Sequence, residues 1–559
     1  MSHHKYSHLS KSELLELISK LENGKKYGLV WEESSPEKVV LDCEKLTPIL
    51  QLEEEKKIIT SAEDINHVLI EGDNYHALKV LSYTHQVKID LIYIDPPYNT
   101  GKSDEFLYND KYVDLDDEYR HSKWLSFIHK RMKLAKDLLS ETGVIFIAID
   151  DNEIAQLKLL CNQLFGEANF VAQFVRKNKV GSGHDSSQIA VEYDYMLCFA
   201  KNKSKLEFAK ETLDVANDKK YKLKDAHVAR RGKYYLRDLD YKGSYSKSMD
   251  YAITTPDQTK IYSGGKFGKP NTWRWNKEKF EWGIENDFIV FKKNKDQWKV
   301  YIKQYQYVDN KDAIRIRKLP YRGLIKFLNS QGSQELNNML KQRIFKFPKS
   351  TELLEFCINL LPQKDITVLD FFAGSGTTGH AVLKANKKDG GKRQFILCTN
   401  NENSICQDVT YPRIEKAIHG YTNAKGKKIE SLGGNLLHFT TAFAEEASTK
   451  NLLSSCASIL CLKEGVFNLK LATKEFFIFE KDEQILAIHF GLNKNSLEKL
   501  KNNLNQLKHK KTLYIFAEPE LISKEINIIE WTNTELKALP IELSIIYPKL
   551  IRHEKKQSK

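Results

Sequence analysis

The sequence predicts an α/β fold, and this prediction depends on two blocks in which short apolar runs alternate with helical patterns. The blocks cover residues 61–200 and 341–420. In both, the apolar runs end at turn residues, which is typical of buried parallel strands connected by helices. The two blocks therefore form either two separate sheets or a single sheet to which both contribute.

The first block contains three predicted strands and two predicted helices. Its strands cover residues 68–70, 91–94 and 144–149, and its helices cover residues 77–81 and 118–139. The long helix has apolar side chains along one face, as expected for a helix that packs on a sheet. Before this block, residues 1–60 are predicted to form an N-terminal helical segment, because leucines and Ile18 recur there at near-helical spacing.

The second block has the same character, and it is followed by a third section. The predicted strands of the second block cover residues 366–371 and 394–398, and its helices cover 351–361 and 377–385. Residues 421–559 are predicted to form a small C-terminal α/β domain. Its strands are expected near 476–479, 485–490 and 512–516, with a helix over 496–507.

Composition narrows the class of protein. The chain has 559 residues, of which 41% are hydrophobic and 29% charged, as in soluble globular proteins. No apolar run approaches the ~20 residues of a membrane span, and the first ten residues lack the apolar core of a signal peptide. We therefore expect a cytoplasmic protein. The eight cysteines form no CxxC pair, and we expect no metal site.

The first chemical motif is Asp95-Pro96-Pro97-Tyr98, which directly follows the apolar run at residues 91–94. Proline donates no backbone hydrogen bond and holds the preceding residue extended, so the strand must end in a rigid turn. Open α/β sheets bind ligands at this end of their strands. The Asp95 carboxylate and the Pro96 carbonyl can each accept one N–H of a planar amine, and Tyr98 can stack on a base. These four are candidate catalytic residues; a plain Pro-Pro loop is the alternative.

The second motif follows the predicted strand at residues 366–371 and opens a helix. It reads Asp370-Phe371-Phe372-Ala373-Gly374-Ser375-Gly376-Thr377-Thr378. Small residues let a ligand approach the backbone, and a helix N-terminus favours an anionic group such as a carboxylate. The spacing is neither that of a P-loop nor that of the dinucleotide fingerprint. Glu402, after the next strand, can bind ribose hydroxyls, although a surface carboxylate is the alternative. A nucleoside ligand fits this pair.

Together these motifs resemble the DNA amino-methyltransferases of the β group, in which the catalytic motif precedes the cofactor motif. Further stretches are similar to the modification subunit of type III restriction–modification systems. They are residues 27–31, 71–75, 99–101, 119–124 and 149–153. The resemblance covers roughly residues 25–200 and 340–440, and its motifs together are highly specific.

The resemblance implies one circularly permuted, Rossmann-like domain that uses S-adenosylmethionine and is assembled from both blocks. It implies a role in cofactor binding for three sets of residues. The methionine part is held by Asp370, Phe372, Ala373, Gly374, Ser375, Gly376 and Thr377, with Pro348, Lys349 and Ser350 beside them; Glu402 holds the ribose, and Asp73 lies near the adenine. In such enzymes an aspartate at the position of Asp95 favours N6 of adenine over N4 of cytosine.

Residues 201–340 have a different composition, with dense lysine and arginine and frequent aromatic residues. The net charge of the whole chain is +13, which favours a polyanionic partner. In the resembled family this position carries target recognition, so we expect an inserted domain that binds double-stranded DNA. Its candidate DNA-binding residues include Arg230, Arg231, Lys233 and Arg237. A solvated basic surface beside an ordinary aromatic core is the alternative. A paired target base would have to be flipped out of the duplex.

Several functions remain open from the sequence. The runner-up enzymes are a cytosine-N4 DNA methyltransferase and a methyltransferase for RNA or a protein amide. A DNA-binding specificity subunit with a decayed catalytic site is the alternative without an activity. The chain has no Walker-type helicase motif and no strong nuclease pattern, so the resemblance implies a separate restriction subunit that contains helicase and nuclease. We expect the C-terminal section to serve subunit contacts, including those of a homodimer.

Overall fold

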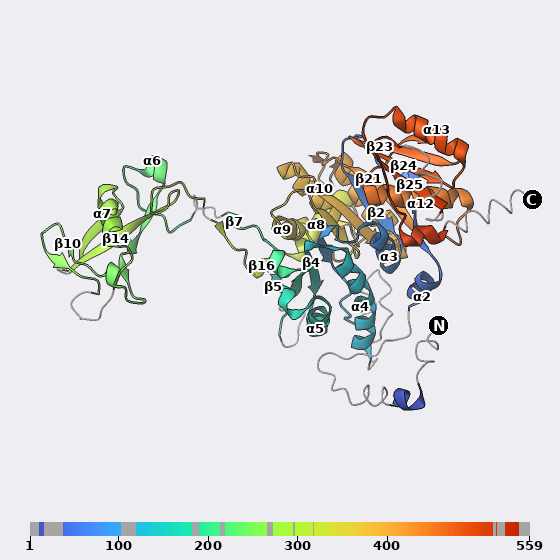
Figure 1. Ribbon diagram of the computed structural model, residues 1–559. Coiled ribbons are helices and arrows are strands. Elements are labelled where there is room, and N and C mark those ends of the chain that lie inside the picture. The colour runs from blue at the N-terminus through green and yellow to red at the C-terminus, as the bar shows by residue number, and fades with distance from the viewer. Residues whose placement is uncertain are drawn as a thin grey trace, which may run out of the picture. The chain divides into compact units, whose positions relative to one another are not determined.

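The computed structural model divides into two compact units (Figure 1). The first comprises Met1–Phe208 and Arg322–Lys559, and the second comprises Ala209–Tyr321. The structure describes residues 10–15, 37–101, 119–181, 189–212, 218–264, 272–294, 297–316, 318–517, 521–522 and 531–546. Within these residues, no helix combines the length and the apolar character needed to cross a membrane.

The first unit is built on a ten-stranded sheet to which both predicted blocks contribute. Its order is β1-β21-β2-β18-β17-β3-β4-β6-β5-β16. The strands are β1 (Pro48–Leu52), β2 (Asn66–Glu71), β3 (Ile89–Ile94), β4 (Leu139–Ile149), β5 (Phe170–Lys177), β6 (Tyr193–Ala200), β16 (Leu324–Lys326), β17 (Thr367–Asp370), β18 (Gln394–Thr399) and β21 (Asn435–Phe443). From β21 to β4 all neighbours are parallel. The predicted α/β class is confirmed.

The helices of this unit form two groups, and within each group consecutive helices pack against each other. One group contains α3 (Asn74–Thr84), α4 (Arg120–Leu138) and α5 (Ile154–Phe165); the other contains α9 (Thr351–Asn359), α10 (Thr377–Asp389) and α11 (Tyr411–His419). The central strands between them are fully buried, as Leu91, Val368 and Ile396 illustrate. Each such side chain contributes about 1.5–3 kcal/mol by leaving water. Two further helices, α2 (Lys38–Lys45) and α8 (Asn329–Leu340), complete this part.

A second sheet follows within the same unit. It has five strands, β22 (Asn468–Ala472), β23 (Phe476–Lys481), β24 (Gln484–Phe490), β25 (Lys510–Phe516) and β26 (Thr534–Leu536). Helix α13 (Lys494–Asn505) shares one apolar cluster with this sheet. Helix α12 (Thr449–Glu464) shares the large cluster that also contains the ten-stranded sheet. A short pair, β19 (Tyr421–Thr422) and β20 (Lys428–Ile429), precedes β21.

Three strands of the ten-stranded sheet lie outside the segments that the sequence assigned to it. β16 lies within residues 201–340, which were predicted to be the inserted domain, and it pairs with β5. β1 lies within residues 1–60, which were predicted to be a helical segment, and β21 lies within the predicted C-terminal domain. β1 and β21 pair with each other, Pro48 opposite Phe443, and β21 continues the sheet beside β2. Part of the N-terminal helix that the sequence predicts, at residues 16–21, lies outside the described residues.

The second unit has its own small sheet and its own core. Its three-stranded antiparallel sheet contains β8 (Tyr234–Asp238), β13 (Ile289–Asn294) and β14 (Gln297–Tyr305). Two helices, α6 (Val228–Arg231) and α7 (Lys277–Glu285), and three strand pairs, β7–β15, β9–β12 and β10–β11, complete it. These pairs are β7 (Glu211–Thr212), β15 (Lys318–Leu319), β9 (Asp240–Tyr241), β12 (Thr272–Trp273), β10 (Ile253–Thr254) and β11 (Lys260–Ile261). The core contains Trp273, Trp275, Phe280 and Phe288, so part of the aromatic content expected at a recognition surface is interior.

Candidate active site

The two chemical motifs lie at the same edge of the ten-stranded sheet. The 95–98 loop follows β3, and the 372–377 loop follows β17. β3 and β17 are neighbouring parallel strands, with Leu91 opposite Val368. Because parallel strands end at the same edge, both loops open into one cavity of about 510 Å³. This volume lies within the range of ligand and cofactor sites.

Most of the predicted site residues line this cavity. From the two loops and the segment before α9 they are Asp95, Pro97, Tyr98, Pro348, Lys349, Asp370, Phe372, Ala373, Gly374, Ser375 and Thr377. Five predicted residues are not part of its lining, namely Asp73, Pro96, Ser350, Gly376 and Glu402. The loops that sequence alone placed at strand ends are thus brought together by the fold.

Asp95 is held by an ion pair with Lys349. The Lys349 Nζ atom lies 2.8 Å from Oδ1 and 2.6 Å from Oδ2 of Asp95, and the Tyr98 hydroxyl donates to the same Oδ1 at 2.9 Å. The ammonium also lies 5.1 Å from the centre of the Tyr98 ring. Burial, followed by the Asp95 charge, raises the pKa of Tyr98 well above its usual value, so the phenol stays protonated. The carboxylate therefore already binds N–H and O–H donors in an ordered arrangement.

The 372–377 loop has an open backbone that a ligand can approach. Gly374 and Gly376 adopt φ values of 47° and 73°, a region that side chains with a Cβ disfavour. At its start, the buried Asp370 accepts hydrogen bonds from the Phe372 N–H at 3.0 Å and from the Thr378 hydroxyl. Burial raises the pKa of Asp370 to about 7. The small side chains of this loop, which lines the cavity, fit a nucleoside-bearing cofactor.

Two residues that the sequence did not suggest hold this loop from behind. The buried Arg413 of α11 donates to the Thr377 hydroxyl at 2.7 Å and pairs with Glu335 of α8 at 3.1 Å. The Thr410 hydroxyl donates to the Gly374 carbonyl at 2.5 Å. No local pattern identifies either residue, because the contacts join positions that lie far apart in the sequence.

Further charged residues line the same cavity, namely Asp150, Asp151, Asp194 and Arg176. Arg176 is buried and makes a bidentate ion pair with Asp194, with Nε 2.7 Å from Oδ1. Although burial opposes it, this pair raises the pKa of Arg176, so the guanidinium keeps its charge. No local sequence pattern indicates this pair.

The predicted residues outside the cavity lining have local structural contacts. The Asp73 carboxylate caps α3 by accepting the Tyr75 N–H at 2.7 Å, and the Ser350 hydroxyl caps α9. Glu402 is exposed at the start of a 3₁₀ turn after β18. Their predicted contacts with adenine, methionine and ribose remain predictions.

Among the predicted DNA-binding residues of the second unit, Arg231 needs a correction. The residue is 4% exposed, and its guanidinium lies 3.0 Å from Asp312 and 4.6 Å from the centre of the Phe288 ring. A buried, ion-paired guanidinium cannot reach a phosphate without breaking this pair. Arg231 is therefore a core residue.

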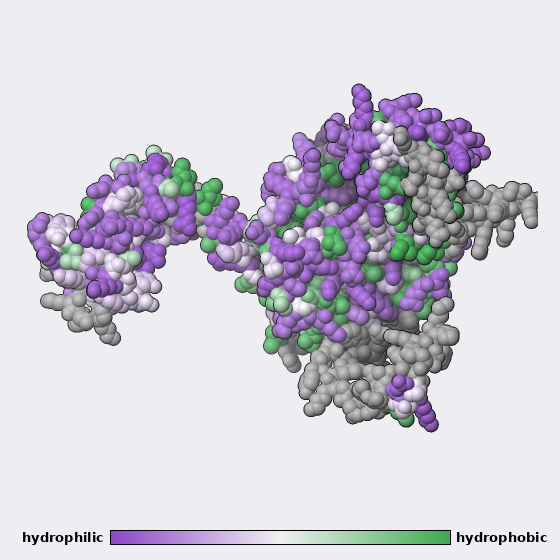
Figure 2. All heavy atoms as spheres, in the orientation of Figure 1, coloured by the Kyte–Doolittle hydropathy of each residue, from purple (hydrophilic) through white to green (hydrophobic). Residues whose placement is uncertain are grey.

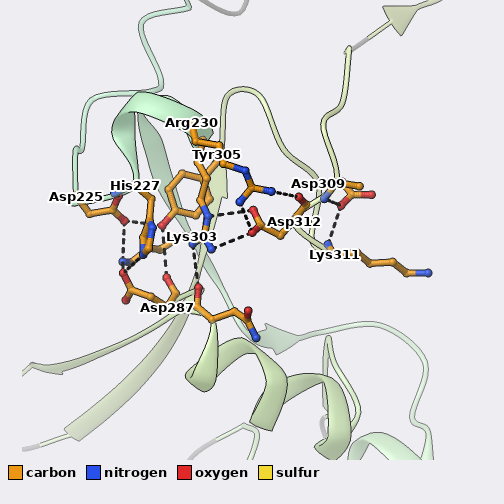
Figure 3. A network of polar contacts seen from close by, with 12 residues as sticks. Asp225, His227, Arg230, Asp287, Lys303, Tyr305, Asp309, Lys311 and Asp312 are labelled. Atoms are coloured by element: carbon orange, nitrogen blue, oxygen red, sulfur yellow. Dashed lines mark hydrogen bonds and ion pairs between the residues drawn. The ribbon is translucent and has the colours of Figure 1, made fainter.

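The other three positions differ in exposure. Arg230 is exposed, although its guanidinium pairs with Asp312 at 2.6 Å (Figure 3). Arg237 is exposed on β8, and Lys233 is half-buried. Figure 2 shows mainly hydrophilic side chains on the visible face of this unit.

One group of potential metal ligands occurs among the described residues, and it is Glu71, Cys406 and His438. The same Glu71 oxygen accepts hydrogen bonds from Lys56 at 3.1 Å and His438 at 2.9 Å. An ammonium group at this oxygen disfavours a second cation. The cluster is a hydrogen-bonded junction between β2, β21 and the 3₁₀ turn at Glu54–Lys56.

The fold and the cavity define an α/β protein with a ligand-sized cavity beside a loop that presents a carboxylate and an aromatic ring. The chain belongs to the N6/N4 DNA methylase family, because the model of that family, described as DNA methylase, matches residues 89–410. It is 32% identical to the type III restriction-modification enzyme EcoPI Mod subunit of Escherichia phage P1, over 70% of this chain and 66% of that protein. It is also 32% identical to the StyLTI Mod subunit of Salmonella typhimurium, over 67% of this chain and 59% of that protein.

The chain thus spans less than two thirds of the length of these two relatives. Among solved structures, the PvuII DNA methyltransferase (cytosine-N4-specific) matches with a TM-score of 0.32 and 13% identity, covering 64% of this chain and 92% of that one.

Proposed function

We propose that this protein is a site-specific DNA methyltransferase that transfers a methyl group from S-adenosylmethionine to N6 of adenine, as the modification subunit of a type III restriction–modification system. The observation that carries this proposal is the shared cavity of the 95–98 and 372–377 loops. Family membership and the similarity to two type III Mod subunits support it.

The cofactor would be held by the 372–377 loop, Asp370 and the segment around Pro348. The small residues Ala373, Gly374 and Ser375 line the cavity, so a ligand there can lie against the loop backbone. When bound, S-adenosylmethionine supplies an electrophilic methyl group on a sulfonium centre. The residues of the chain would orient this group and exclude water around it, and positioning of this kind accounts for much of a transfer rate.

The 95–98 loop would hold the target amine. The Asp95 carboxylate and the Pro96 carbonyl would each accept one N–H of the adenine N6 group, which directs the nitrogen lone pair away from the ring plane. The Lys349 ammonium now donates to both oxygens of Asp95, so an entering amine replaces one of these donors. Tyr98 lies beside this carboxylate and would stack on the base.

We further propose that the target base is flipped into this cavity from duplex DNA and that the second unit, Ala209–Tyr321, carries target recognition. Arg230, Lys233 and Arg237 are its candidate phosphate contacts, with Arg231 excluded for its burial. The strand order supports a circular permutation, since β17, which precedes the cofactor loop, comes after β3 in the chain. Two protein partners are proposed. The similarity to type III Mod subunits supports a restriction subunit as the first. The second is another copy of this chain, bound through the C-terminal section.

The deciding experiment follows radiolabelled methyl transfer from S-adenosylmethionine to DNA, with nucleoside analysis of the product. We expect N6-methyladenine at one short sequence, and loss of transfer in Asp95→Ala with cofactor binding retained. Glu141→Gln is the matched control, because that carboxylate lies on the surface and pairs with Lys205. Recovery of N4-methylcytosine would replace the adenine assignment, and normal turnover of Asp95→Ala would remove Asp95 from the mechanism.

A further inference from the structure

We propose that three residues, His121, Trp124 and Glu153, form a support that positions the 95–98 loop for methyl transfer. This loop support rests on the proposed function, since its readout is the transfer rate. It assigns a role to residues of the stretches at 119–124 and 149–153 that do not line the cavity. All three residues act through the loop, so they are positioning residues.

The first contact of the loop support fixes the middle of the loop. The Trp124 Nε1–H donates to the carbonyl oxygen of Pro97 at 2.8 Å, and the indole is buried in the first turns of α4. Two consecutive prolines leave the loop without N–H groups of its own at these positions. At the two proline positions the backbone can be held only through its carbonyl groups, and Trp124 donates to one of them.

The second contact fixes the exit of the loop. Asn99, the residue after Tyr98, adopts a φ of 57°, which residues other than glycine adopt rarely. Its amide Nδ2 donates to Glu153 Oε1 at 2.5 Å. The Nδ1 atom of His121 lies 2.6 Å from the same oxygen. Glu153 thus links the strained exit residue to the start of α4, where Trp124 also lies.

The burial of Glu153 indicates that this hydrogen-bonded link belongs to the protein interior. Its side chain is 0% exposed, and within the described residues its second oxygen has no hydrogen-bond partner. Burial raises the pKa of Glu153, although Asn99 and His121 favour its charged form. Burial of a carboxyl group in this way costs free energy. We infer that the protein tolerates this cost because the carboxyl group fixes the geometry of the adjacent loop. Because the loop also carries Asp95, a displacement of about 1 Å would reduce transfer about 100-fold.

The test compares Glu153→Ala, Glu153→Gln, Asn99→Ala and the double variant Asn99→Ala/Glu153→Ala in the full chain. For Glu153→Ala we expect kcat to fall about 10- to 100-fold, while the Kd for S-adenosylmethionine changes less than about threefold, because the 372–377 loop is untouched. Glu153→Gln keeps an acceptor for Asn99 and should recover most of kcat. The double variant should be no slower than Glu153→Ala, since both changes break one link. Glu141→Gln again serves as the matched surface control.

Two results would overturn the loop support. One is a wild-type kcat in Glu153→Ala. The other is a parallel loss of kcat, cofactor affinity and urea midpoint, with no recovery in Glu153→Gln, which would indicate a general structural role. If Glu153→Ala does not fold, Asn99→Ala carries the same comparison, because Asn99 is partly exposed. A wild-type chain that methylates no DNA would instead overturn the proposed function and with it the loop support.

Discussion

Asp370 is buried at the end of β17, directly before the 372–377 loop, where it accepts hydrogen bonds from the Phe372 N–H and the Thr378 hydroxyl. Burial raises its pKa from 3.8 to about 7. The folded-state pKa therefore lies above the unfolded one. A group of this kind contributes full stability below the unfolded pKa, and this contribution is lost as the pH rises through the folded pKa. The upper limit of the effect is about 4 kcal/mol, from the shift between 3.8 and about 7.

We therefore expect Asp370→Asn to gain stability relative to the wild type as the pH rises from 5 to 8. The asparagine amide is neutral at both values, and its oxygen can still accept the Phe372 N–H. The measurement is the free energy of unfolding in urea for both proteins at each pH. An equal difference between the two proteins at pH 5 and pH 8 would contradict the assignment of a raised pKa to Asp370.

Lys349 joins both halves of the site, because its ammonium binds Asp95 and its carbonyl accepts the Thr377 hydroxyl at 3.2 Å. In Lys349→Met the carbonyl contact remains and the two hydrogen bonds to the carboxylate are lost. We expect kcat to fall about tenfold or more, as for other charge-assisted hydrogen bonds, with little change in cofactor affinity. Single-turnover kinetics and calorimetric titration measure the two quantities separately. A loss of cofactor affinity with unchanged kcat would assign Lys349 to the cofactor alone.

At the scale of elements, the 372–377 loop depends on two helices, α8 and α11. Arg413 of α11 binds Thr377 in the loop and Glu335 of α8, so it fixes three segments at one point. Although burial opposes it, Arg413 lowers the pKa of Glu335, which therefore stays ionised. Breaking a buried ion pair by removing one partner typically costs about 3–5 kcal/mol.

Arg413→Met should therefore lower stability and also weaken S-adenosylmethionine binding at least tenfold. Arg393→Met is the matched control, because the equally buried Arg393 pairs with Asp389 at 2.8 Å at the far end of α10, away from the loop. The control should lose stability but keep its cofactor affinity. Urea unfolding and calorimetric titration of both variants provide the comparison. Equal cofactor affinities in the two folded variants would show that Arg413 has no specific effect on the loop.

The elements also show what the sequence could predict. The 95–98 and 372–377 loops were predictable because each signal is local: an apolar strand, then residues with special backbone requirements. The pairing of β3 with β17 joins distant parts of the chain. Asp90 and Thr367, which are hydrogen-bonded across this pair, are 277 residues apart. Only the resemblance to a known family suggested it, since neither strand carries a pattern that specifies its neighbour.

Contacts between distant side chains were beyond local patterns. Arg413 and Glu335 are 78 residues apart, and Arg231 and Asp312 are 81 apart. A lysine- and arginine-rich composition does not distinguish an exposed cation from one with a buried partner, which is why Arg231 was wrongly grouped with surface residues. The same reason applies to Trp273 and Trp275, whose interior positions depend on how the second unit folds.

At the scale of the whole molecule, the chain combines a net charge of +13 with two separate compact units. A basic excess of this kind supports binding to DNA phosphates. For such binding, the logarithm of the association constant falls linearly with the logarithm of the salt concentration. Each phosphate contact contributes about 0.9 to the slope. The slope therefore counts exposed cations that touch DNA, whereas buried cations affect it only through folding.

This difference separates Arg237 from Arg231. For Arg237→Ala we expect a salt slope for duplex DNA reduced by about 0.9 with unchanged unfolding, since the side chain is exposed on β8. For Arg231→Ala we expect a loss of stability, because Asp312 loses its buried partner and the Phe288 ring loses its cation. Fluorescence anisotropy across a salt series, with urea unfolding of each variant, provides both quantities. A reduced slope for Arg231→Ala with wild-type stability would return that arginine to the DNA-binding surface, because only a guanidinium that reaches a phosphate changes the slope without changing the fold.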